Sequence, residues 1–201
     1  MNKILTVITV FCIVILLTFL LPTHGEAEIY DSVIRLHVIA NSNSEEDQLL
    51  KFKVRDSVLE ATNGISLQTS DISDAKKIFE NNITVIKEAA EECIRNEGYN
   101  YDVSICLTEE GYPTKSYENL CFPAGKYLSL QVKIGDSLGE NWWCVLFPPL
   151  CMSAATEMTA ADALIDIGFT SDQYRIITDT NEASYNIRFK ILETFEKAFN
   201  S

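Results

Sequence analysis

The chain begins with an uninterrupted apolar run before any alternating pattern appears. Residues 4–21 contain no charged side chain, follow Lys3, and precede the small residues Gly25 and Ala27. This order of basic, apolar and small-residue regions is typical of an export signal. The run also reaches the lower limit for crossing a bilayer, about 17 residues. The pattern therefore predicts export, with residues 1–27 acting either as a cleaved signal peptide or as a retained membrane anchor.

Period-two alternation then predicts a strand, and helical spacing predicts two helices after it. Residues 32–40 alternate apolar side chains with Arg35 and His37. A capping signal and three acids open a helix over 45–62, expected to end at Asn63-Gly64. Regular apolar spacing predicts a second helix over 72–96. The apolar stripe of the first helix is expected to contain Leu49, Leu50, Val54, Val58, Leu59 and Ala61.

Three further strands and a terminal helix complete the predicted fold. The strands are expected over about 101–107, 128–134 and 142–147, and the helix over 182–199. Residues 109–126, rich in Gly and Pro, are predicted to form a long loop, and the pattern over 150–180 is too mixed for boundaries. This order predicts an α+β fold: an N-terminal export helix, then one two-layer domain over 28–201 with helices packed on a mainly antiparallel sheet.

The charge balance narrows the classes of partner. The chain has 29 Asp and Glu against 16 Lys and Arg, a formal net charge of -13. Nucleic acids and anionic membrane surfaces attract basic proteins, so this composition argues against both. We expect membrane contact only through residues 4–21, if that segment is not cleaved.

The sequence offers little that is typical of an enzyme. It has two histidines, His24 and His37, and no spacing of potential ligands that is typical of a metal site. No nucleotide-binding or hydrolase motif occurs, so we expect neither a metal nor a cofactor. A thiol hydrolase or cell-wall-modifying enzyme using Cys144 and His37 stays an alternative.

Five cysteines follow the export segment. Cys144 and Cys151 flank Pro148-Pro149, a turn that can bring them close enough for a disulfide. Cys93 lies on the apolar face of the second helix and is expected in the core, whereas a bridge between Cys106 and Cys121 is left open by the sequence.

Adjacent tryptophans form the other unusual feature. Trp142 and Trp143 on one strand must point to opposite faces, and Phe147 follows on the same strand. These aromatic side chains can be structural core, or they can be rigid anchors of a protein interface.

Three strings carry a resemblance to a known family. They are residues 35–42 (RLHVIANS), the charged run over 46–56, and above all residues 139–151 (GENWWCVLFPPLC). Together they resemble the stage II sporulation protein R family of endospore-forming bacteria, over about 30–151. Residues 152–201 carry no motif that matches.

The resemblance implies a signalling protein without catalysis of its own. Members are described as exported from the forespore into the intermembrane space. There they activate a membrane-embedded aspartic peptidase, which removes the pro-sequence of the sigma-E precursor in the mother cell.

A lipid- or wall-binding module is a further alternative. The residues expected to contact the partner are Arg35, His37, Asn41, Trp142, Trp143 and Phe147.

Overall fold

A computed structural model of the protein describes residues 3–19, 29–66, 69–117, 120–152, 164 and 167–178. Helix α1 (Lys3–Phe19) is apolar, with many side chains exposed. Within the described residues, no helix combines the length and apolarity that membrane crossing needs. The export role of residues 1–27 therefore stays a prediction. The terminal helix expected over 182–199 lies outside the described residues.

A four-stranded sheet forms the centre of the fold. Its strands are β1 (Ile34–Ile39), β2 (Val103–Tyr112), β5 (Gly125–Ile134) and β6 (Asn141–Phe147), in the order β2-β5-β1-β6. The β2–β5 and β1–β6 pairs are antiparallel, but β1 and β5 are parallel. The predicted α+β class is confirmed, with a mixed sheet. The parallel pair is possible because β1 and β5 are not joined by a hairpin: the chain between them passes through α3, α4 and the strands β2, β3 and β4.

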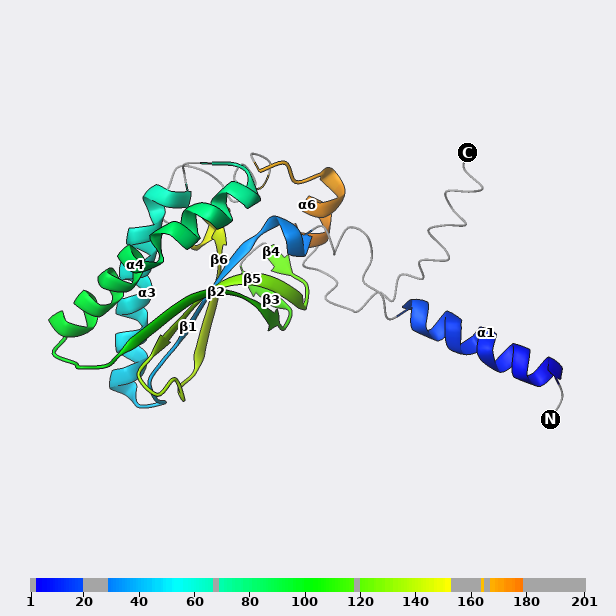
Figure 1. The fold of residues 1–201 in the computed structure, drawn as a ribbon, viewed down its shortest axis with the longest axis horizontal. Helices are drawn as coiled ribbons and strands as arrows, with labels where there is room; N and C mark the ends of the chain where they lie inside the picture. The colour runs from blue at the N-terminus through cyan, green and yellow to red at the C-terminus, as the bar shows by residue number, and fades with distance from the viewer. Residues whose placement is uncertain are drawn as a thin grey trace.

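Two long helices cover one face of this sheet. Helices α3 (Glu45–Ser66) and α4 (Ile72–Asn96) lie side by side there (Figure 1). The α4 boundaries match the prediction, and Asp71 caps its first turn by accepting hydrogen bonds from two backbone N–H groups. Helix α3 runs past the expected stop at Asn63-Gly64 and ends at Ser66.

The main core lies between these helices and the sheet. It combines one face of β1 with the inner faces of α3 and α4, and Cys93 packs against it as predicted. Its fully buried members include Ile34, Leu36, Val38, Val54, Val58, Phe79, Ile86, Ala90, Leu130 and Val132.

Among the described residues, the opposite face of the sheet is covered at one end. Strands β3 (Lys115–Tyr117) and β4 (Leu120–Phe122) form a small second sheet, and α6 (Ser171–Thr178) packs near β4 (Figure 1). A second apolar cluster joins them to the main sheet. The two-layer expectation is therefore incomplete, because a partial third layer exists.

The predicted loop over 109–126 is wrong. Strand β2 continues to Tyr112 and pairs with β5 along ten residues, from Val103 opposite Ile134 to Tyr112 opposite Gly125. The short strands β3 and β4 occupy most of the remainder. The Gly and Pro residues that suggested a loop lie at the strand ends or on the edge strand β2, positions where sheets tolerate them.

Candidate partner-binding site

The pairing of β1 with β6 brings His37 and Trp143 together on the face of the sheet away from α3 and α4. The two residues are directly opposite each other in the antiparallel register. Their ring centroids lie 5.5 Å apart with an interplanar angle of 34°. Trp143 is half-buried, so part of its indole is accessible at the edge strand.

His37 is held in one orientation by polar neighbours on β2 and β6. The Glu110 carboxylate lies 3.1 Å from Nδ1, and the Asn141 Oδ1 atom lies 2.9 Å from Nε2. Glu110 also accepts a hydrogen bond from Gln131 Nε2. His37 is only 8% exposed. Its imidazole therefore acts as a fixed support for Trp143 rather than as a free surface side chain.

Lys115 completes this site from the small β3–β4 sheet. Its Nζ atom lies 4.1 Å from the centre of the Trp143 ring, a cation–π contact. We call the surface made by His37, Glu110, Lys115, Asn141 and Trp143 the Trp143 surface. It joins β1, β2, β3 and β6, so its geometry depends on the folded sheet.

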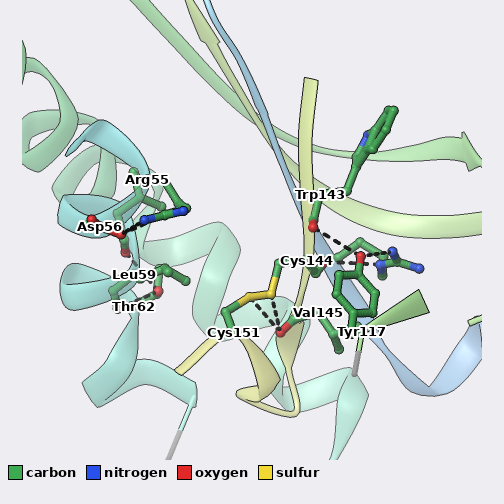
Figure 2. The surroundings of a disulfide bond; sticks show 11 residues. Arg55, Asp56, Leu59, Thr62, Tyr117, Trp143, Cys144, Val145 and Cys151 are labelled. Carbon is green, nitrogen blue, oxygen red and sulfur yellow. Dashed lines mark hydrogen bonds and ion pairs between the residues drawn. A yellow bond between two sulfur atoms is a disulfide. The ribbon is translucent and has the colours of Figure 1, made fainter. Parts of the chain in front are cut away.

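Arg35 holds in place the small β3–β4 sheet that carries Lys115. The Arg35 guanidinium donates through Nε to the Cys144 carbonyl at 3.1 Å and through Nη2 to the Tyr117 hydroxyl at 2.8 Å. Tyr117 donates in turn to the Trp143 carbonyl at 3.1 Å (Figure 2). Because Tyr117 and Lys115 both belong to β3, this chain of hydrogen bonds fixes Lys115 over Trp143.

The Arg35 side chain is enclosed by aromatic rings and is 0% exposed. Its Cζ atom lies 4.4, 4.9, 5.3 and 5.8 Å from the ring centres of Tyr112, Tyr127, Phe122 and Tyr117. Burial raises the pKa of Tyr112, although Ser129 and Arg35 act in the opposite direction. Arg35 therefore cannot touch a partner in this conformation, and its role is to position the site.

Phe147 is also inaccessible to a partner. It is 1% exposed and belongs to the core beneath the helices. The β1–β6 ladder has an irregularity between Ile34 and Arg35, which places Phe147 opposite Ile34. The prediction that Phe147 contacts a partner is not compatible with this packing.

Asn41 connects three parts of the chain. Its Nδ2 donates to Asp47 at the start of α3 at 2.8 Å, and its Oδ1 accepts from the Asp136 backbone N–H at 2.9 Å. Burial alone raises the pKa of Asp47, but hydrogen bonds from Ser42 and Asn41 lower it below its usual value. Both ends of the Asn41 amide are therefore used inside the protein.

Trp142 lies on the other face of β6, toward α3. The Arg55 guanidinium lies 4.9 Å from the Trp142 ring and 5.0 Å from the Phe52 ring. Leu49, one turn before Phe52, is 57% exposed. The prediction that Leu49 belongs to the buried stripe of the helix is wrong, because Lys51 occupies a buried position instead, donating to the Glu140 carbonyl.

The disulfide expected between Cys144 and Cys151 is present (Figure 2). It joins β6 to the short 3-10 helix η1 (Leu150–Met152). Both sulfurs approach the Val145 carbonyl oxygen, at 3.7 and 2.9 Å, and these are close contacts because disulfide sulfurs carry no proton. The Trp143 indole points away from the bond in Figure 2.

The structure does not assemble the alternative thiol site. Cys144 is bonded to Cys151 and lies opposite Leu36, whereas His37 points to the other face of the sheet. Cys106 and Cys121, for which the sequence left a second bridge open, are both free. In the described part of the chain, no group of three or more His, Cys, Asp or Glu side chains could hold a metal ion.

The sequence pattern does not reveal Lys115 and Tyr117 as site residues, because both fall in the segment predicted to be a loop. The signal that could have revealed them is the short alternation of polar and aromatic residues in Lys115-Ser116-Tyr117 and Leu120-Cys121-Phe122. Of the predicted contact residues, the structure brings His37 and Trp143 together and places Trp142 on the opposite face of the same strand.

Comparison with known proteins agrees with the resemblance. The family model described as stage II sporulation protein R matches residues 30–157. A relative from Bacillus subtilis (strain 168), stage II sporulation protein R, is 39% identical over 121 residues, covering 60% of this chain and 54% of the relative. The chain thus matches about half the length of that relative. No solved structure matches. The matched region contains all four strands of the main sheet and both long helices, and the chain belongs to the stage II sporulation protein R family.

Proposed function

We propose that this protein is an exported signal of endospore formation that activates a membrane-embedded aspartic peptidase. The peptidase then removes the pro-sequence of the sigma-E precursor in the mother cell. Membership of the stage II sporulation protein R family supports a role in sporulation. The role in peptidase activation is the finer step that this proposal adds.

The observation that carries the proposal is the rigid, half-exposed Trp143. Its ring contacts both the fixed His37 imidazole and the Lys115 ammonium group, so little side-chain freedom is lost when a partner covers it. Tryptophan is also among the residue types that contribute most to protein interfaces. A preordered aromatic side chain on an edge strand is suited to binding another protein, which is what an activator without catalysis must do.

The proposed location is the space between the forespore and mother-cell membranes. The apolar segment over 4–21 supports export, and residues 28–201 would form the exported signalling domain. The disulfide between Cys144 and Cys151 is consistent with this location, since such bonds persist outside the reducing cytosol.

The test is co-expression of the full chain with the peptidase and the sigma-E precursor in a non-sporulating host. We expect wild-type protein to trigger processing, and Trp143→Ala to reduce it strongly while the variant stays folded and exported. Val85→Ala is the matched control, because Val85 is an apolar side chain on α4 that is 55% exposed and far in sequence from the Trp143 surface. Normal processing with exported Trp143→Ala would contradict the proposed surface, and no processing with wild type would contradict the proposed function.

A further inference from the structure

The Trp143 surface displays hydrogen-bond donors that the described part of the protein does not use. Lys115 Nζ contacts the Trp143 ring, yet no carboxylate among the described residues lies within ion-pair distance of it. Asn141 is exposed, and its Oδ1 faces His37, which leaves its Nδ2 group free to donate. Lysine and the amide Nδ2 both require acceptors.

The acceptor groups of the same surface are already occupied. The Glu110 carboxylate is bound by His37 and Gln131. The Trp143 carbonyl accepts from Tyr117, and the Cys144 carbonyl accepts from Arg35. The site therefore has unused donors around an apolar ring, and its acceptors are internally satisfied.

Several described lysines lack an ion pair, and Lys115 differs from them in its fixed position over the Trp143 ring. The chain carries 29 acidic against 16 basic residues, so a cation has many potential internal partners. Elsewhere, Lys53 pairs with Glu97, Lys77 with Asp74, and Lys87 with Glu91. Lys115 is instead held over Trp143 by a hairpin that is itself fixed through Tyr117 and Arg35.

We propose that the Trp143 surface recognises a partner segment that carries a carboxylate next to an apolar side chain. The carboxylate would pair with Lys115 and accept from Asn141, and the apolar side chain would cover the exposed part of Trp143. This inference rests on the proposed function, in that the partner is taken to be the part of the peptidase exposed outside the mother-cell membrane. Charge complementarity favours this occupant. The chain has a formal net charge of -13, so most of its surface repels an acidic segment, whereas Lys115 attracts one.

The test uses three full-length variants in co-expression with the peptidase and the sigma-E precursor. Lys115→Glu reverses the charge, and Lys115→Arg keeps both the charge and the ring contact. Lys126→Glu, on an exposed residue at the start of β5, makes the same change in net charge outside the surface. Thermal unfolding of each purified variant checks the fold, and two readouts are taken: the fraction of precursor processed, and recovery of the detergent-solubilised peptidase on the tagged protein.

We expect Lys115→Glu to weaken peptidase recovery about tenfold or more, the scale of a close interfacial charge pair. Lys115→Arg and Lys126→Glu should stay near wild type. Recovery with wild type should fall more steeply with added salt than the residual recovery with Lys115→Glu, because the ion pair is screened.

Three outcomes would overturn the inference. Normal recovery of the peptidase with folded Lys115→Glu would show that the surface does not bind a carboxylate. The proposed function would still stand in that case if Trp143→Ala abolished processing. Equal losses with Lys115→Arg and Lys115→Glu would show that charge is not what is recognised. A change in sedimentation of the isolated protein on Lys115→Glu would assign the acidic occupant to a second copy of the chain. Failure of wild type to trigger processing would instead overturn the proposed function.

Discussion

Arg35 and Tyr117 meet inside the protein, where the guanidinium Nη2 donates to the phenolic oxygen at 2.8 Å. This contact links the central strand β1 to the small sheet that carries Lys115. It also leaves Tyr117 oriented to donate to the Trp143 carbonyl. A buried arginine thus determines the shape of a surface that it does not itself reach.

Removing the Tyr117 hydroxyl should therefore destabilise the protein and loosen the Trp143 surface. Tyr117→Phe keeps the ring but leaves Arg35 Nη2 without its acceptor, and Arg35 Nη1 has no acceptor among the residues that the structure describes. We expect a loss of about 1–3 kcal/mol in the free energy of unfolding, measured in urea. Tyr99→Phe, which changes a half-buried tyrosine beside Tyr101, serves as the control and should change stability by less than about 0.5 kcal/mol. Equal stability of the two variants would contradict the assigned role of Tyr117.

Asp47 should make stability depend on acid pH. Its folded-state pKa is lowered, so its contribution is complete above the unfolded-state pKa, about 3.9, and is lost as the pH falls through the folded-state value. Asp47→Asn should be less stable than wild type at pH 7 by about 1–3 kcal/mol. The difference should narrow below about pH 4. Unfolding curves of both proteins from pH 7 to pH 2 test this, and a gap independent of pH would show that the carboxylate charge does not matter.

Gly139 should not tolerate a side chain. A Cβ atom built there would lie 2.2 Å from the Ser42 carbonyl oxygen and 2.8 Å from Ala40 Cβ, and main-chain atoms cannot move aside cheaply. Gly139→Ala should lower stability by about 1–3 kcal/mol. The control is Gly111→Ala, because nothing lies within 4 Å of its Cβ position. If thermal unfolding showed the two variants to be alike, the close packing of the turn against Ser42 would be wrong.

The disulfide should contribute to stability through the unfolded chain. Cys144 and Cys151 lie seven positions apart in the sequence, so the bond closes a short loop worth about 2–3 kcal/mol in the loop-entropy treatment. A Cys144→Ala, Cys151→Ala double variant should unfold at a lower temperature than oxidised wild type. Added reductant should lower the wild-type midpoint and leave that of the variant unchanged. A reductant effect of equal size on both proteins would contradict this assignment.

The local spacing of apolar residues predicted the elements that bury one continuous apolar face. The apolar positions of α4, among them Phe79, Ile86 and Ala90, repeat at helical spacing and are buried as expected. In α3 the pattern was misleading at Leu49, because Asp47 and Lys51 find hydrogen-bond partners in the segments around Ser42 and Glu140 and so take buried positions. Partners distant in sequence decided which side chains this helix buries.

The candidate site was predictable only in part for the same reason. His37 and Trp143 stood out by residue type and by strand pattern, and their meeting follows from the β1–β6 register. Lys115 and Tyr117 lie in a segment whose Gly and Pro residues suggested a loop. Their importance depends on the contacts with Trp143 and Arg35, which join residues 26 to 82 positions apart along the chain. Such contacts leave no local signal.

Crosslinking between the Trp143 surface and the peptidase tests directly whether this surface contacts the peptidase. A photo-reactive amino acid placed at Asn141, which is exposed beside His37, would be compared with one placed at Val85 on α4. Both proteins are first checked for their ability to trigger processing of the sigma-E precursor. We expect a covalent product with the peptidase from position 141 and none from position 85. A product from position 85 alone would contradict this expectation.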